Sequence, residues 1–297
     1  MSRPIALVSA RAARGLDEDL EPLAAALGGL ALAFEVVDWD DPGIDWSRYA
    51  LALLRSTWDY STRLGEFLAW LERAAARTAV WNPPALIRWN VDKHYLADVA
   101  RAGVAIVPST FVEPGGAAAD ALRRFLDEHA AAELVVKPAV GAGSRDAQRY
   151  GREETAAIVG HMERLLGAGR SVLLQPYLER VDAEGETALI YFEGRFSHAI
   201  RKAALLQRGS APTRALFAAE QIGARRAAPA ERALAERALA AVPFAKALYA
   251  RVDLIGAGDG SPRLLELELT EPSLFFAHCP IGAAGFAEAI GRLLKNQ

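Results

Sequence analysis

The chain has 297 residues, of which 52% are hydrophobic and 24% charged, so it can form a core and disorder is not expected. Its net charge of −3 gives no electrostatic footprint for nucleic acid or a membrane surface. A single cysteine excludes an internal disulfide, and no apolar stretch reaches the roughly 18 residues of a spanning helix. We therefore expect a soluble, cytoplasmic protein with a small-molecule partner. The sequence leaves the oligomeric state open, a homodimer included.

Residues 1–88 show strands alternating with helices, which is the pattern of βαβ units and a mainly parallel sheet. Each predicted strand is a short apolar run, and each predicted helix has apolar residues on one face. The strands are Ile5–Ser9, Phe34–Trp39, Leu51–Leu54 and Val80–Trp81, and the helices are Asp17–Leu27 and Glu66–Ala76. These residues predict an N-terminal α/β domain.

Residues 89–178 mix helices with isolated strands and predict a small α+β lobe. The expected helices are Asp92–Ala102, Ala117–Ala132 and Glu153–Gly167, and the expected strands are Val104–Val107, Leu134–Lys137 and Val172–Gln175. The helix ending at Ala102 is followed by Gly103, a residue typical of a helix C-cap.

Residues 179–297 predict a second α+β lobe built on antiparallel hairpins. Thr187–Phe192 and Arg195–Arg201 flank Glu193-Gly194, a two-residue hairpin loop. Gln207–Ala228 shows no period and predicts a loop, whereas Pro229–Leu248 predicts a helix with a break at Pro243. Two further strands, Tyr249–Ile255 and Arg263–Thr270, and a helix, Gly282–Leu294, complete the chain.

The hairpin formed by the last two strands carries an acidic face. In the simplest register Asp253 lies opposite Glu266 and Arg251 opposite Glu268, so all four share one face, while Val252, Leu254, Leu265 and Leu267 share the other. Three close carboxylates repel one another unless a cation lies among them, and an all-oxygen donor set favours Mg²⁺ or Mn²⁺. Taken alone, however, Leu-Glu-Leu-Glu-Leu favours an ordinary half-exposed strand.

A lysine and a glycine loop upstream supply a candidate phosphate site. Lys137 ends the strand Leu134–Lys137, and Gly141-Ala142-Gly143-Ser144 follows soon after. Free backbone N–H groups in such a loop can approach a polyphosphate, and a lysine adds a point charge. By itself this pattern is common. The P-loop motif and the dinucleotide fingerprint are absent.

In combination these motifs resemble the ATP-grasp superfamily, whose members are three-lobed ATP-dependent ligases. The likeness covers about residues 89–297 and rests on the order of seven segments. They are Asn90–Lys93, Val135–Pro138, Gly141–Asp146, Gln175–Leu178, Arg201-Lys202, Arg251–Asp253 and Leu265–Glu268. Relatives often have Asn at the position of Glu268, so the number of metal ions is left open.

The resemblance implies a role for each matching residue. Asp253, Glu266 and Glu268 correspond to metal ligands for Mg²⁺, and Arg251, Lys202 and Arg201 to catalytic cations. The residues expected to bind ATP are Lys93, Lys137, Gly141, Gly143, Ser144, Gln175, Tyr177, Leu178 and Asp182. Of these, Gln175–Leu178 is the expected adenine hinge and Asp182 the expected ribose ligand.

Other segments are similar to the cyclo-ligases that convert O-ureido-D-serine to D-cycloserine. They are Leu54–Tyr60, Arg88–Asn90 and Leu269–Leu274, and with them the resemblance spans nearly the whole chain. It places residues 1–88 on the substrate side, with Arg55, Ser56, Thr57 and Ser273 as candidate substrate contacts. Arg55 could bind a carboxylate bidentately or form a surface salt bridge.

The resulting hypothesis is a carboxylate-activating ligase with an acyl-phosphate intermediate and intramolecular ring closure. Two rivals remain. One is an intermolecular amide or peptide ligase acting on amino acids, and the other is a non-catalytic module that binds ATP for regulation.

Overall fold

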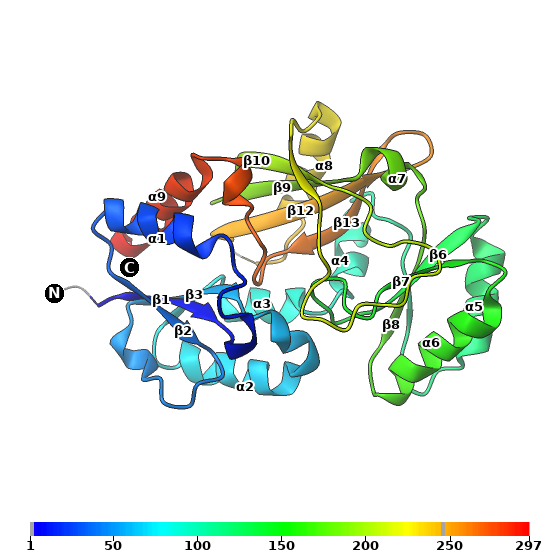
Figure 1. Cartoon of the computed structure of the whole chain (residues 1–297), viewed down its shortest axis with the longest axis horizontal. Coiled ribbons are helices and arrows are strands. Elements are labelled where there is room, and N and C mark those ends of the chain that lie inside the picture. Colours follow the sequence, from blue (N-terminus) through cyan, green and yellow to red (C-terminus); the bar gives the residue numbers. More distant parts are fainter. Residues whose placement is uncertain (1–2, 245–246, 297) are drawn as a thin grey trace.

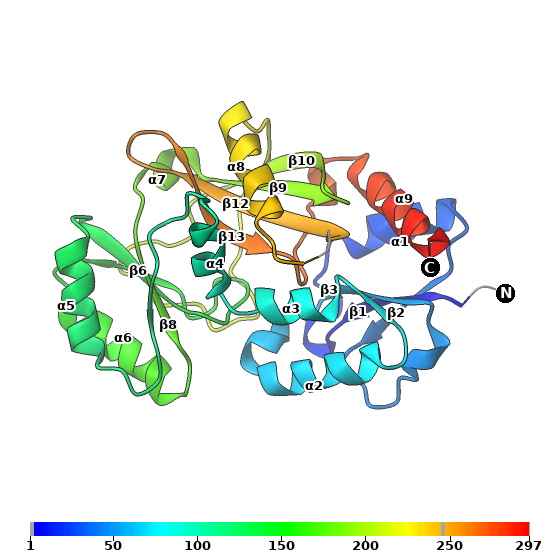
Figure 2. The same cartoon turned by 180° about the vertical axis from the view of Figure 1, so that it is seen from behind.

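The computed structural model describes residues 3–244 and 247–296 and contains three β-sheets. The N-terminal sheet lies at one end of the molecule and a small antiparallel sheet at the other, with a five-stranded sheet between them (Figure 1; Figure 2 shows the reverse side). This confirms the expected combination of α/β and α+β architecture. Within the described residues, no helix is long and apolar enough to cross a membrane.

The N-terminal sheet is parallel, with the order β2-β1-β3-β4. Its strands are β1 (Ile5–Ser9), β2 (Phe34–Asp38), β3 (Leu51–Ser56) and β4 (Ala79–Trp81). Ile5 and Leu7 pack with α1 (Leu20–Gly29) and α9 (Gly282–Lys295), whereas Ala6 and Val8 face the side of α2 (Leu64–Ala75). The last helix of the chain therefore completes the core on one face of the first sheet (Figure 1).

The small sheet is antiparallel, with the order β5-β8-β6-β7, and α5 and α6 cover one face. Its elements are β5 (Thr110–Val112), α5 (Ala118–Glu128), β6 (Glu133–Pro138), β7 (Gln148–Gly151), α6 (Thr155–Gly167) and β8 (Val172–Pro176). Phe125 of α5 and Met162 of α6 pack in one cluster with Val136 and Leu174 of the sheet. This separate core lets the small sheet act as a rigid wall.

The central sheet is antiparallel, with the order β11-β10-β9-β12-β13. Its strands are β9 (Glu186–Phe192), β10 (Arg195–Lys202), β11 (Ile222–Arg225), β12 (Tyr249–Gly256) and β13 (Pro262–Glu268). Helices α4 (Tyr95–Arg101) and α8 (Pro229–Ala240) pack on one face through Leu96 and Leu234. The remaining short helices are η1 (Arg11–Ala13), η2 (Trp46–Arg48), η3 (Trp58–Thr62), α3 (Pro84–Asn90), α7 (Arg180–Glu184) and η4 (Phe276–His278).

Several elements differ from the sequence predictions. Val104–Val107 forms no strand, because only Ile106 bridges to β13, and the next strand is Thr110–Val112. The helix predicted over Pro229–Leu248 ends at Ala240, before Pro243, and residues 245–246 of that prediction lie outside the described chain. Helix α1 begins at Leu20 rather than Asp17, where the Asp17 carboxylate accepts the Asp19 N–H and the Asp19 carboxylate accepts the distant Phe276 N–H.

The predicted register of the acidic hairpin is confirmed from Arg251 to Asp253 and wrong beyond Asp253. Asp253 pairs with Glu266 and Arg251 with Glu268, as alternation predicts. An irregularity after Asp253 then places Leu254 opposite Leu264. The extra residue turns Leu264 into the core, whereas Leu265, expected there, lines a cavity.

Candidate active site

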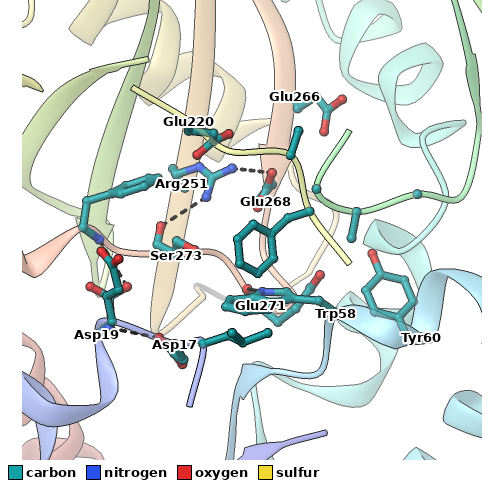
Figure 3. Close-up of a pocket in the computed structure, with 18 of the residues that line it drawn as sticks. Asp17, Asp19, Trp58, Tyr60, Glu220, Arg251, Glu266, Glu268, Glu271 and Ser273 are labelled. Atoms are coloured by element: carbon teal, nitrogen blue, oxygen red, sulfur yellow. Dashed lines mark hydrogen bonds and ion pairs between the residues drawn. The ribbon is translucent and has the colours of Figure 1, made fainter. Parts of the chain in front are cut away.

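Two adjoining cavities lie beside the central sheet. The first, about 400 Å³, is bounded by loops of the N-terminal sheet and by the segment after β13, and the second, about 180 Å³, lies between the small and central sheets. Both are lined by Lys93, Gly141, Ala142, Gly143, Glu220, Arg251, Glu266 and Glu268. They therefore adjoin at a shared charged wall. Figure 3 shows the residues of the first cavity, among them Arg251, Glu266 and Glu268 of this wall.

One half of the shared wall is organised around Asp253. This buried carboxylate accepts hydrogen bonds from Arg251 Nε at 2.9 Å and from Lys202 Nζ at 2.8 Å, and Arg251 also forms an ion pair with Glu268. Burial opposes the charge on Asp253, but Arg251 and Lys202 outweigh it and hold its pKa well below the ordinary value. Glu268 differs, because burial raises its pKa despite Arg251. The structure thus brings Arg251, Lys202, Asp253 and Glu268 together.

The other half is organised around Glu266. Lys137 Nζ donates to Glu266 Oε1 at 2.7 Å, and Lys93 Nζ lies 3.6 Å from Oε2 while donating to the Gly141 carbonyl at 3.0 Å. Burial again opposes the charge, yet the two lysines lower the pKa of Glu266 to about 2. Glu266 is therefore a carboxylate at neutral pH, and both predicted lysines reach it.

The three carboxylates lie on one face but do not form a preassembled metal cage. Among the residues described, no group of three His, Cys, Asp or Glu side chains is placed to hold an ion. Each acid is instead paired with Lys or Arg. The donor set fits Mg²⁺, which binds a few carboxylates and completes its shell with water and phosphate oxygens. Arriving phosphates would draw away the lysines and free the acids, so their metal role stays a prediction.

The glycine loop covers the second cavity, and a long segment packs against it. Gly143 has φ +59°, and a Cβ built on it would lie 2.5 Å from the Cβ of Phe217. Ala218 N–H donates to the Gly143 carbonyl at 3.0 Å, and Phe217 meets the Trp58 ring edge-on at 5.3 Å. Glycine is needed here because both the φ angle and the close approach exclude a side chain. We call residues 207–221 the strap.

The apolar side of the second cavity contains the expected hinge. Gln175, Tyr177 and Leu178 line it together with Ser144 and Leu265. Gln175 is buried, and its Nε2 donates to Ser109 Oγ at 2.9 Å. The structure thus places the hinge on the same cavity as Lys137 and the glycine loop.

Two predicted residues face away from both cavities. Arg201 donates to the carbonyl oxygens of Glu184 at 2.7 Å and Ala183 at 3.1 Å, because neighbouring residues of β10 point to opposite faces and Lys202 takes the inward position. Asp182 is bound by Arg149 at 3.0 Å and by the Tyr177 hydroxyl, and it lines neither cavity. Neither residue lines a cavity in this structure, and the catalytic role of Arg201 and the ribose contact of Asp182 stay predictions.

The candidate substrate contacts Arg55, Ser56 and Thr57 are fully buried and line neither cavity in this structure. The alternative of a surface salt bridge for Arg55 is wrong, because its ion pair with Asp19 is buried. Arg55 lies behind the wall, where it donates to Asp19 Oδ2 and to the Pro272 carbonyl, each at 3.3 Å. Its guanidinium holds the wall together rather than facing the cavity. Ser273 does line the first cavity, and its carbonyl accepts from Arg251 Nη1 at 3.1 Å.

Sequence reasoning missed two aspartates of the first cavity. Asp19 accepts backbone N–H groups from Leu274, Phe275 and Phe276. Asp17 Oδ1 accepts from Asp19 N–H at 3.0 Å, whereas its buried Oδ2 has no partner, and burial raises its pKa. The available signal was an acidic run after the first strand, at the carboxyl edge where open α/β sheets bind ligands.

A third acid, Glu271, was also missed as a site residue. It follows β13, is only 6% exposed, and lines the first cavity with Trp58 and Tyr60 (Figure 3). Burial and the neighbouring Glu268 raise the pKa of Glu271 to about 8. This carboxyl therefore stands out from Glu266, whose pKa is shifted in the opposite direction.

Comparison with solved structures places this architecture in a known class. The ATP-grasp ligase PsnB, bound to a minimal precursor, Mg and ADP, matches with a TM-score of 0.64 at 20% identity over 98% of each chain. D-alanine–D-alanine ligase from Bacillus anthracis matches with a TM-score of 0.68 at 16% identity over 99% of each chain. The fold is that of the ATP-grasp ligases.

Sequence comparison identifies the family within the ATP-grasp ligases. A family profile described as the N-terminal domain of D-cycloserine synthetase DcsG matches residues 5–82. The cycloserine biosynthesis protein DcsG of Streptomyces lavendulae is 42% identical over 297 residues, covering 98% of this chain and 99% of that protein. The crystal structure of D-cycloserine synthetase DcsG matches with a TM-score of 0.91 at 41% identity, covering 98% and 99%. The chain belongs to the D-cycloserine synthetase family, and is an ATP-dependent ligase of the class that uses ATP and Mg²⁺.

Proposed function

We propose that this protein closes O-ureido-D-serine to D-cycloserine at the expense of ATP, through an acyl phosphate. The observation that carries the proposal is the wall shared by the two cavities. It gives a nucleotide in the second cavity and a small substrate in the first a common surface of Lys93, Arg251, Glu266 and Glu268. The full-length likeness to DcsG supports this choice of substrate.

In this proposal the second cavity holds ATP. The adenine lies at Gln175–Leu178, and the phosphates lie under the glycine loop at Lys93 and Lys137. Asp253, Glu266 and Glu268 would hold Mg²⁺, which neutralises phosphate charge when bound. This exchange of partners is favourable. Each carboxylate loses a lysine or arginine and gains the metal, and each of these cations gains a phosphate oxygen.

The first cavity holds the amino-acid part of the substrate. Asp17 and Asp19 form an acidic edge, and the unpaired Oδ2 of Asp17 is suited to accept a hydrogen bond from the α-ammonium group. Arg251 lies at the junction, where it can orient the carboxylate towards the γ-phosphate. This arrangement places the reacting atoms between the cavities.

The reaction then proceeds in two steps. A carboxylate oxygen attacks the γ-phosphorus and ADP leaves, while Arg251 and Lys202 stabilise the charge on the transferred group. The alkoxy-bearing nitrogen next attacks the acyl carbon, and phosphate leaves as the ring closes. D-cycloserine lacks the carbamoyl group of the starting compound, so after these two steps one water breaks the bond between the ring nitrogen and the carbamoyl carbon. The ring nitrogen takes a proton, and the carbamoyl group leaves as carbamic acid, which gives carbon dioxide and ammonia. Ring closure is intramolecular, so holding the chain folded can supply several kcal/mol.

The test is product formation by the purified protein with O-ureido-D-serine, ATP and Mg²⁺, and no added amine. We expect ADP and D-cycloserine in equal amounts, with the ring identified by mass spectrometry. Glu266→Gln should lower both by at least about 10–100-fold, the loss typical of residues that only support a metal ligand.

Two other results would contradict the proposal in different ways. Turnover only with another amino acid plus an amine would identify an intermolecular ligase. No ADP release with any amino acid tested, despite ATP binding, would identify a regulatory nucleotide-binding module.

A further inference from the structure

The segment after β13 forms an unusually well-anchored wall of the first cavity. Its four consecutive carbonyl oxygens, from Thr270 to Ser273, each accept a hydrogen bond from a side chain of another element. The donors are the Tyr249 hydroxyl at 2.8 Å, Trp58 Nε1 at 3.1 Å, Arg55 Nη1 at 3.3 Å and Arg251 Nη1 at 3.1 Å, in that order. This segment is therefore held from both the N-terminal domain and the central sheet, and the backbone of Glu271 is fixed.

The side chain of Glu271 projects from this fixed backbone into the first cavity (Figure 3). Among the described residues its carboxyl group makes no hydrogen bond or ion pair with another residue, although the residue is buried. Charged neighbours act only at longer range, namely Glu268, Arg251 and Lys93. Both carboxyl oxygens are consequently available to a ligand. Glu266 and Glu268 of the shared wall are instead paired with cations.

The position of Glu271 separates it from the phosphoryl-transfer groups. It lines the first cavity only, whereas Arg251, Glu266 and Glu268 line both. Tyr60 lines the same cavity, but burial raises its pKa well above the ordinary value, so its hydroxyl keeps its proton. Glu271 is therefore placed to accept a proton away from ATP, as are Asp17, Asp19 and His278, which also line the first cavity only. Of the three acids, Asp17 and Asp19 form the edge assigned to the α-ammonium group, which leaves Glu271 for the proton.

We propose that Glu271 is the general base of ring closure, an inference that rests on the function proposed above. Its carboxylate accepts the N–H proton of the alkoxyurea nitrogen as that nitrogen attacks the acyl phosphate. The new C–N bond forms with the nitrogen electron pair, the acyl C–O bond breaks, and phosphate departs with that pair. An alkoxyurea nitrogen is a poor nucleophile while protonated, so a base in contact with it accelerates this step by about 10²–10⁴-fold.

This assignment also gives the burial of Glu271 a purpose. A carboxylate in water is a weak base, whereas desolvation strengthens its hold on a proton. The aromatic residues Trp58 and Tyr60 line the same cavity as the carboxyl group and leave less room there for water. They shield the acyl phosphate, which water would otherwise hydrolyse.

The test separates the two chemical steps in Glu271→Gln. We expect ring formation to fall by about 10²–10⁴-fold. Acyl-phosphate formation should persist, so that ADP release exceeds D-cycloserine formation and added hydroxylamine traps the acyl phosphate as a hydroxamate. Glu271→Asp, which keeps a shorter carboxylate, should recover part of ring formation. Glu288→Gln is the matched control, because Glu288 is an exposed residue of α9 and lines neither cavity.

The outcomes distinguish the two proposals. If the wild type forms the ring and Glu271→Gln forms it equally fast, the role of Glu271 is overturned and the proposed function stands. Equal losses of ring formation and hydroxamate in that variant, at an unchanged Tm, would also overturn it and indicate a role before ring closure. If Glu271→Gln does not fold, the same two readouts on Glu271→Asp decide. A wild type that makes no ring would overturn both proposals.

Discussion

The two cavities differ in whether their acidic side chains are paired. On the side of the second cavity, acids are paired with bases, as in Lys137 with Glu266 and Lys202 with Asp253. In the first cavity, Asp17 keeps one carboxylate oxygen without a partner, and Glu271 makes no polar contact through its carboxyl group within the described chain. The same type of side chain is thus satisfied in one cavity and left available in the other.

This difference agrees with the proposed division of the ligands between the two cavities. Buried charges are costly unless paired, so a site for a ligand that carries both signs can pair its own acids and bases until the ligand arrives. Magnesium with a polyphosphate is such a ligand. An acid without a partner instead suits a ligand that brings N–H donors or a positive charge. An amino-acid substrate does so.

The largest expected effect on turnover is at Arg251, which lines both cavities and pairs with two acids. Arg251→Lys keeps one charge but cannot bind Asp253, Glu268 and the Ser273 carbonyl together. We expect kcat to fall by about 10³-fold, the lower range for an arginine that stabilises phosphoryl transfer. Steady-state ADP release measures it.

The control measurements for this variant are its Tm and its Kd for ATP. A retained charge next to Asp253 should keep the Tm close to that of wild type, so a large fall in Tm would show that the loss is structural. A fall in kcat of less than tenfold would show that Arg251 does not act on the transferred group.

An intermediate effect is expected at Asp17. Asp17→Asn removes the charge beside the unpaired Oδ2 while keeping the side-chain shape. Loss of a charged hydrogen bond costs about 1.5–3 kcal/mol, so KM for the amino-acid substrate should rise about 10–100-fold. The Kd for ATP should not change, because Asp17 lines only the first cavity.

Asp127→Asn is the matched control, since Asp127 is exposed on α5. An equal rise in KM for ATP and for the amino acid would contradict the division between the cavities. An unchanged KM for both would place the ammonium group elsewhere.

The sequence predicted the shared wall better than it predicted the first cavity. The faces of β12 and β13 follow from alternation, so Arg251, Asp253, Glu266 and Glu268 could be placed together. Periodicity alone does not reveal an irregularity, which is why Leu265 was assigned to the core. The same alternation could have separated Arg201 from Lys202, but the inward face of β10 depends on its partner in the sheet.

The first cavity depends on contacts between residues far apart in the chain. Arg55 binds Asp19, 36 residues earlier, and Asp19 binds backbone groups from 255 to 257 residues later. No local pattern signals such contacts. The sequence therefore left Arg55 open between a substrate contact and a surface salt bridge, and Asp17 and Glu271 were not recognised. Their roles follow from burial and missing partners, which only a folded structure displays.

The smallest expected effect concerns the strap, which bears on both cavities. Phe217→Ala removes the edge-on contact with Trp58 beside the first cavity and leaves the glycine loop in place. Such an aromatic pair contributes about 0.5–1.5 kcal/mol, so KM for the amino-acid substrate should rise about 2–12-fold. Water should also reach the acyl phosphate more readily, and ADP release should exceed D-cycloserine formation.

Phe244→Ala, which breaks a similar pair with Trp89 outside both cavities, should change neither quantity. Full coupling in Phe217→Ala would show that the acyl phosphate is protected by the wall of Trp58, Tyr60 and Glu271 without help from the strap.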